Sequence, residues 1–300
     1  MKFDIQNLNK YIVASDTDSL FITIEPIIKK NYPDIDLTNT EEVLPITKQY
    51  QQDIGDKLNK YQSVLAKNLL NSDDHFFDLK PEYIIKKAYW AGKRRYAQHL
   101  VDQEGIRKDD IVMMGLDIMK SNFPPYFREF GENILKSILF GKSKIDIDKD
   151  VITFKTSLSN ISYNKLLKPT GVKKIEDYIE RPPLAGEIFS KLLPRTPINS
   201  RSAIIYNDLL RFKKLNKKYP EFRIGDKMYI AYLKPNPYRL NVMGCNGYND
   251  PPEIQEFIEK YIDRGIIFES IMKNKLESIY NDLGWKLNLN PIQSKFFNFN

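Results

Sequence analysis

Apolar residues in the first third of the chain change their spacing twice, and each spacing predicts a different element. Two β-rich apolar runs in residues 10–24 flank the polar sequence Ser-Asp-Thr-Asp-Ser, as in a β-hairpin. Helical spacing follows at positions 46, 50, 54, 58, 61, 65 and 69, after a candidate capping box of Thr38 and Glu41. Residues 76–100 return to strand-like chemistry with a break near Gly92. This order predicts a layer of sheet and helix.

The pattern changes again after Gly115, where we place a domain boundary near residue 119. A proline pair followed by apolar residues at helical spacing predicts a helix that ends at Gly141. Beyond it we expect short strands over 142–196, a helix over 198–215, strands over 226–245, and helices after the capping sequence at 250–253. The expected fold class is α+β.

The net charge of the chain and its distribution indicate which kind of molecule the protein binds. The chain of 300 residues and 35.2 kDa has a net charge of +7. Between Lys80 and Tyr96 there are six positive side chains and one negative, so most of the excess is local. A local basic excess indicates a polyanionic partner.

The cysteine count and the distribution of apolar residues exclude some kinds of protein and of metal site. With Cys245 as its single cysteine, the chain has neither an internal disulfide nor a four-cysteine metal site, so a metal would be bound through oxygen. No run approaches the roughly 20 apolar residues that span a bilayer. We expect a cytoplasmic protein, in the host cytoplasm if a phage encodes it, with no membrane partner.

Asp16 and Asp18 form the first candidate functional site. In the predicted hairpin both carboxylates project to one side, where their charges repel unless a cation lies between them. Mg²⁺ prefers such oxygen ligands. Other Asp-x-Asp pairs, such as 34/36 and 146/148, lack flanking apolar strands. The residues alone leave two alternatives, metal ligation and an exposed polar turn.

The basic segment Lys93-Arg94-Arg95-Tyr96 is the second candidate. Strand alternation would place Lys93 and Arg95 on one face and Arg94 and Tyr96 on the other, so that one face could meet DNA. A charge run of this kind is also explained by a solvated surface.

Residues 14–19, Ala-Ser-Asp-Thr-Asp-Ser between strands, resemble the third polymerase motif of family B DNA polymerases, with Ser15 in place of the usual glycine. The resemblance implies that Asp18, and less directly Asp16, hold two Mg²⁺ ions. It also implies a catalytic role for Glu82, which lies 14 residues before Tyr96 in a sequence similar to the acidic strand of the family. A salt bridge of Glu82 with Lys86 or Lys87 is the alternative.

Further motifs extend the resemblance toward the C-terminus. Residues 93–97 resemble the Lys-Lys-Arg-Tyr motif, residues 115–121 the palm-to-thumb junction, and residues 197–207 a thumb segment of phage members. An ion pair on a helix face would also explain Arg201. The DNA-binding residues implied by these motifs are Lys93, Arg94, Arg95, Tyr96, Lys120, Ser121, Arg201 and Asn207.

The resemblance implies three regions. Residues 1–119 would be the C-terminal half of a polymerase palm, an antiparallel sheet with helices. Residues 120–287 would be a mostly helical thumb with small β elements. The tail, 288–300, resembles peptides that bind a sliding clamp through Gln293, Phe296, Phe297 and Phe299, and a tail folded back on the thumb is the alternative.

The remaining polymerase motifs have no counterpart here. No segment resembles the first palm motif, the fingers motif or the exonuclease acids, and Met1 lies only 15 residues before Asp16. We therefore expect a phage-type polymerase portion that binds primer-template DNA and dNTP, and that shares a two-Mg²⁺ site with a second chain carrying those motifs. A non-catalytic DNA-binding or clamp-recruiting subunit is the alternative.

Overall fold

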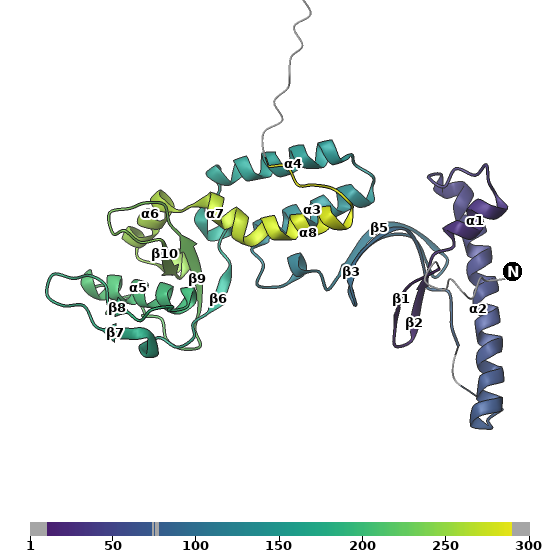
Figure 1. Ribbon diagram of the computed structural model, residues 1–300, viewed down its shortest axis with the longest axis horizontal. Helices are drawn as coiled ribbons and strands as arrows, with labels where there is room; N and C mark the ends of the chain where they lie inside the picture. The colour runs from purple at the N-terminus through teal and green to yellow at the C-terminus, as the bar shows by residue number, and fades with distance from the viewer. Residues whose placement is uncertain (1–10, 74, 76–77, 290–300) are drawn as a thin grey trace, which may run out of the picture. The chain divides into compact units, whose positions relative to one another are not determined.

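The computed structural model describes residues 11–73, 75 and 78–289, and the chain divides into two compact units, Met1–Leu116 and Asp117–Asn300. Helices and antiparallel sheets occur in both, which confirms the predicted α+β class (Figure 1). The tail residues Gln293, Phe296, Phe297 and Phe299 lie outside the described residues. None of the described helices is both long and apolar enough to cross a membrane.

Unit 1 begins with the predicted hairpin, in which β1 (Ile12–Asp16) pairs antiparallel with β2 (Ser19–Ile22). Helices α1 (Glu25–Asn31) and α2 (Thr40–Leu70) follow it. The capping box predicted at Thr38 is wrong by one position, because the side chain of Asn39 accepts the Glu41 N–H. Thr38 instead donates its N–H and hydroxyl to Asp36.

A three-stranded antiparallel sheet completes unit 1. Its order is β3 (Tyr83–Gly92), β4 (Arg95–Gln103) and β5 (Ile106–Met114). Strand β5 was not predicted, because residues 107–110 are all charged, although apolar residues such as Ile111 and Met113 lie between its exposed positions. The predicted alternation through 93–96 is wrong as well, since Lys93 and Arg94 form the turn between β3 and β4.

The two units differ in how much apolar core they bury. Of the buried apolar side chains in the described part of the chain, nine belong to unit 1 and thirty-seven to unit 2. Unit 1 also exposes large apolar side chains, such as Leu69 at 75% and Ile106 at 66%. Unit 1 alone therefore covers little of its own apolar surface.

One part of unit 2 is a helical layer around aromatic side chains. It contains α3 (Pro125–Leu139), α4 (Lys144–Ser157), α7 (Arg264–Phe268), a π-helical stretch (Glu269–Lys273) and α8 (Asn274–Asp282). Phe154 stacks on Phe130 at a centroid distance of 3.8 Å and meets Phe127 edge-on. Helix α4 corrects the prediction of strands over 142–196, which holds only for the short β6, β7 and β8 (Pro169–Gly171, Ile179–Arg181 and Lys191–Leu192).

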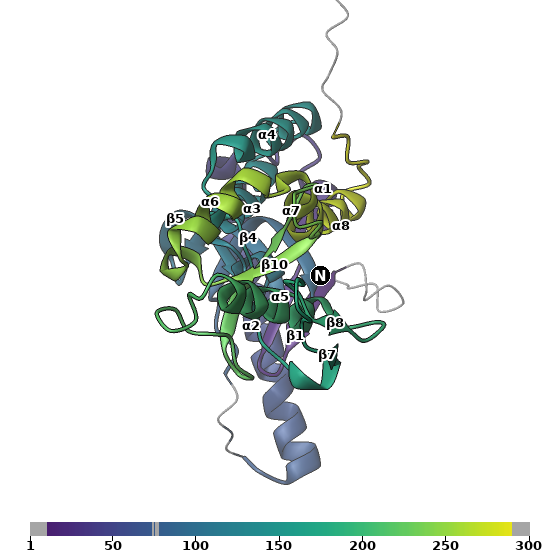
Figure 2. The same cartoon turned by 90° about the vertical axis from the view of Figure 1, so that its left-hand side faces the viewer.

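The other part of unit 2 places a helix on a small sheet. Helix α5 (Ile198–Phe212) packs on β10 (Val242–Cys245) (Figure 2). Strand β10 pairs with β9 (Lys227–Tyr232) in the order β10-β9-β6 (Figure 1). A Cβ on Gly244 would lie 2.9 Å from the Ser202 carbonyl oxygen, so the helix approaches the strand at a glycine. Helix α6 (Pro252–Tyr261) follows. The predicted helix over 198–215 and strands over 226–245 are confirmed.

A buried carboxyl group lies in this second part of unit 2. Asp250 is 2% exposed, accepts the backbone N–H of Asn246 and is hydrogen-bonded to the hydroxyl of Tyr206. Burial raises the pKa of Asp250 to about 6, despite these hydrogen bonds. The folded protein therefore takes up a proton at Asp250 at a higher pH than the unfolded chain does.

We predict that this proton makes unit 2 more stable in mild acid. The stabilisation from Asp250 should be complete below about pH 4 and lost as the pH rises through about 6, amounting to about 3 kcal/mol for a pKa difference of about two units. The measurement is denaturant unfolding between pH 4 and 7. Asp250→Asn should flatten the dependence, whereas replacing the exposed Asp177 by Asn should leave it. An equal slope in Asp250→Asn would contradict the assignment.

Candidate functional site

Asp16 and Asp18 lie at the tip of the β1–β2 hairpin. Asp16 ends β1, and its backbone carbonyl accepts the Asp18 N–H at 2.7 Å and the Ser19 hydroxyl at 3.1 Å. Thr17, between the two acids, has the left-handed φ of 52°. A two-residue loop closed in this way fixes the backbone of both carboxylates, and it leaves Asp18 exposed.

Two cations from the β3–β4 turn reach this tip. The guanidinium of Arg94 donates through Nε and Nη2 to the two carboxylate oxygens of Asp16, and Nζ of Lys93 lies 3.8 Å from Oδ1. The Arg94 hydrogen bond lowers the pKa of Asp16, and the same pair raises the pKa of Arg94, with a smaller contribution from Asp18. The structure thus brings together Asp16, Asp18, Lys93 and Arg94.

Close backbone packing holds the turn that carries Arg94. Arg94 has a φ of 56°, and a Cβ on Gly115 would lie 2.0 Å from its carbonyl oxygen. No side chain fits at Gly115, whose own φ is 62°. Arg95 turns back to its own hairpin, donating to the Ala91 carbonyl at 3.1 Å. The sequence marks Gly115 as the start of a motif, but its steric role follows only from the tertiary contact.

Tyr96 connects the hairpin to the sheet. Its ring lies 4.9 Å from that of Trp90, its cross-strand partner, and 6.3 Å from that of Phe21 on β2. Phe21 and Trp90 also meet edge-on at 4.9 Å. Burial raises the pKa of the Tyr96 hydroxyl. The sequence interpretation assigned no site role to Phe21 or Trp90, although both are aromatic residues in predicted strands.

The carboxylates at the tip suit part of a magnesium site. Mg²⁺ commonly takes one or two protein carboxylates, with water and substrate phosphates completing its shell. Asp16 and Asp18 can supply two such ligands. Within the described part of the chain, no group of three or more acidic, histidine or cysteine side chains gathers to hold a metal alone.

Glu82 is placed apart from this tip. It is exposed and precedes β3, and its carbonyl accepts the N–H of Glu104 in the β4–β5 turn, at the end of the sheet away from Arg94. Lys86 does not pair with it, since Lys86 donates to Thr38 and Thr40. The structure does not bring Glu82 to Asp16, and its catalytic role stays a prediction.

The DNA-binding candidates at the start of unit 2 lie around Asp117. Lys120 pairs with Asp117 at 2.6 Å, and Lys275 from α8 binds the other oxygen, so that the pKa of Asp117 falls to about 2. Ser121 is exposed beside Lys120. Both residues are accessible at the surface of unit 2.

The candidates on α5 have structural contacts. Arg201 donates to the Thr196 carbonyl at 3.4 Å, and it forms no ion pair with any residue that the structure describes. Asn207 is 4% exposed, and its amide donates to the Phe222 carbonyl and accepts the Phe222 N–H. A DNA contact of Asn207 would have to break this buried pair of hydrogen bonds.

We predict that Gly115→Ala disturbs the Arg94 turn. The new methyl group forces the Arg94 carbonyl to move, which should cost roughly 1–3 kcal/mol of unfolding free energy in addition to the backbone strain. The measurement is denaturant unfolding of the chain. Gly105→Ala is the matched control, because Gly105 also has a positive φ, 86°, but has open space around its Cβ position. Equal losses in the two variants would contradict the steric role.

Comparison with known proteins relates the chain to a polymerase. No family model matches the sequence. The chain is 20% identical over 282 residues to a DNA-directed DNA polymerase of Escherichia phage RB69, with 89% of this chain and 30% of that polymerase covered. The chain therefore spans about a third of the length of this relative, and it is similar to one region of a phage DNA polymerase.

Proposed function

We propose that this chain is the C-terminal portion of a family B DNA polymerase, with unit 1 as part of the palm and unit 2 as the thumb. The observation that supports this most is the convergence of Asp16 and Asp18 with the cations of the β3–β4 turn. Carboxylates beside a basic turn suit nucleotidyl transfer, because carboxylates bind metal ions, and metal ions and basic side chains together neutralise the negative charge of the phosphates. The distant similarity to a phage polymerase agrees with this proposal.

Each residue of the site has its own part in this proposal. Asp16 and Asp18 would hold Mg²⁺, which supplies charge neutralisation of the triphosphate and activation of the primer 3′-hydroxyl. Lys93 and Arg94 would bind DNA phosphates near the primer end. Tyr96, held by Trp90 and Phe21, positions the basic turn against the hairpin.

Arg94 and a metal ion would compete for Asp16. In the structure both oxygens of Asp16 accept from Arg94, so a cation that binds there has to displace the guanidinium. Arg94 is 65% exposed and Asp16 25%, and ion pairs between accessible side chains are weak. Displacement would free Arg94 for a phosphate, which couples metal binding to DNA binding.

A second polypeptide would complete the enzyme. Unit 1 buries few apolar side chains and exposes Leu69, Leu70 and Ile106. Strands β3 and β5 are the edges of its sheet, and open edges and apolar patches mark surfaces that a partner covers. We propose that this partner carries the first palm motif and the fingers.

The alternative of a non-catalytic DNA-binding subunit also has an observation in its favour. Asp16 is already neutralised by Arg94, and the described residues offer no third ligand. In that case the hairpin would serve only to fix the basic turn.

We predict that Asp18→Asn abolishes Mg²⁺-dependent primer extension by the assembled polymerase. The substitution keeps the size of the side chain but removes a negatively charged ligand, so the rate should fall at least about a hundredfold while DNA binding persists. Asp34→Asn, at another exposed Asp-x-Asp pair, is the control and should stay active. The chain without its partner should show no extension. Normal rates in Asp18→Asn would support the non-catalytic alternative.

We predict that Arg94→Gln strengthens binding of Mn²⁺ to the isolated chain. Removing the guanidinium frees both oxygens of Asp16, so the affinity should rise by a few-fold. Free Mn²⁺ can be measured by electron paramagnetic resonance. Arg95→Gln is the matched control, since Arg95 bonds the Ala91 carbonyl instead. Equal or weaker binding in Arg94→Gln than in the control would argue against Asp16 as a ligand.

A further inference from the structure

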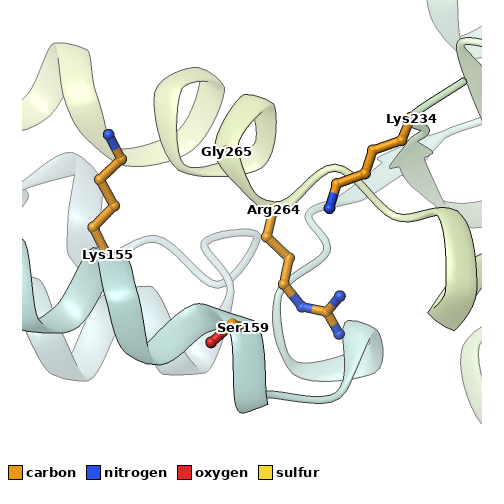
Figure 3. A pocket seen from close by; sticks show the side chains of 5 residues that line it. All are labelled: Lys155, Ser159, Lys234, Arg264 and Gly265. Carbon is orange, nitrogen blue, oxygen red and sulfur yellow. The ribbon is translucent and has the colours of Figure 1, made fainter.

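A basic pocket lies in unit 2. Its volume is about 280 Å³, and it is lined by Lys155, Ser159, Lys234, Arg264 and Gly265 (Figure 3). These residues come from four segments: α4, the short 3-10 helix after it (Leu158–Asn160), the segment that follows β9 and the start of α7. The side chain of Lys234 extends toward the base of the Arg264 side chain, the Arg264 guanidinium points to the side on which Ser159 lies, and the Lys155 ammonium points away from both (Figure 3).

The pocket carries more positive than negative charge. Lys155 and Lys234 form no ion pair with any residue that the structure describes. Lys155 lies over the Phe268 ring, 5.8 Å from its centroid. Arg264 pairs with Glu259, whose other oxygen accepts the Tyr163 N–H, so this carboxylate is already in use. Two of the three cationic charges thus remain uncompensated.

Backbone contacts place the segments that carry two of these cations side by side. Leu233 and Ile262 form an antiparallel bridge, in which Lys234 donates its N–H to the Tyr261 carbonyl at 2.7 Å. The bridge sets Lys234 next to the segment that carries Arg264. The Ile161 carbonyl accepts from Nε and Nη2 of Arg264, at 3.3 and 3.0 Å, which orients the guanidinium. Nη1 of Arg264 has no hydrogen bond to a described residue and is available to a ligand.

We infer that this pocket binds a phosphate group. A guanidinium held in one orientation, with the ammonium group of Lys234 lining the same pocket, matches the charge and the hydrogen-bonding capacity of a phosphate, and Lys155 adds a positive charge farther away on the lining. The volume is at the small end for a ligand pocket, which fits an inorganic phosphate or pyrophosphate, or one phosphate of a nucleic acid backbone, better than a large apolar ligand. No residue of the pocket belongs to the Asp16 site, so the inference does not rest on the metal-binding proposal.

The test compares the full chain with the double variant Lys155→Gln, Lys234→Gln. Lys234 is exposed and Lys155 half-buried, and neither forms an ion pair with a described residue, so the fold should survive the change, and circular dichroism checks this. Calorimetric titration with pyrophosphate should show affinity at least about tenfold weaker in the variant, because the pocket loses two of its three positive charges. Lys136→Gln, at an exposed position on α3, is the control and should bind as the unaltered chain does.

A second measurement distinguishes the sources of the phosphate. If neither protein binds free pyrophosphate, duplex DNA is titrated over a range of salt concentrations. The double variant should then show a salt slope lower by about 0.9 for each DNA phosphate that it no longer neutralises, which identifies backbone phosphate as the ligand. Pyrophosphate affinity and DNA salt slope that both match those of Lys136→Gln would overturn the inference. Arg264→Lys, which keeps the charge but removes the planar donor set, should weaken binding in whichever titration gives a signal.

Discussion

The ion pair between Asp16 and Arg94 is the contact on which the candidate site depends, because it joins two turns that are distant in the sequence. A tight hairpin loop presents the carboxylate, and a second turn, packed against Gly115, presents the guanidinium. The ring contacts of Phe21, Trp90 and Tyr96 hold the two hairpins together behind the pair. The attraction between the Asp16 carboxylate and the Arg94 guanidinium keeps the Asp-x-Asp loop and the basic turn in one site. Another cation that binds Asp16 would have to compete with Arg94 for its oxygens.

The two units stabilise themselves in different ways. Unit 2 buries aromatic and aliphatic side chains between helices and a small sheet. It also buries polar groups such as Asp250, whose ionised form is disfavoured by burial. Unit 1 consists of a hairpin, a long helix and a three-stranded sheet with a small core. Because burial of apolar area is the main source of folding free energy, unit 1 would gain more than unit 2 if the proposed partner covered its exposed side chains.

Local patterns predicted the elements that have strong periodicity or clear stop signals. The hairpin at Asp16, the helix over 198–212 and the strands before Cys245 follow from residue spacing and turn residues. Predictions failed where charge conceals the periodicity. Strand β5 begins with four charged residues after Ile106. In helix α4 the acidic and basic side chains along residues 144–150 draw attention away from the apolar positions Ile147, Val151 and Phe154, which the helix buries at helical spacing. Both are specified by the neighbours on which they pack.

The sequence by itself determined the residue types of the candidate site: two aspartates in a strand-flanked turn, a basic aromatic segment and a net positive charge, with a single cysteine, too few for a four-cysteine metal site. Only the tertiary structure decided which of these residues meet. It placed Arg94 on Asp16, put Glu82 at the other end of the sheet, buried Asn207, and gathered Lys155, Lys234 and Arg264 into one pocket. The physical reason is that side-chain chemistry and local spacing are properties of the chain, whereas strand register, turn geometry and burial depend on contacts between residues far apart in sequence.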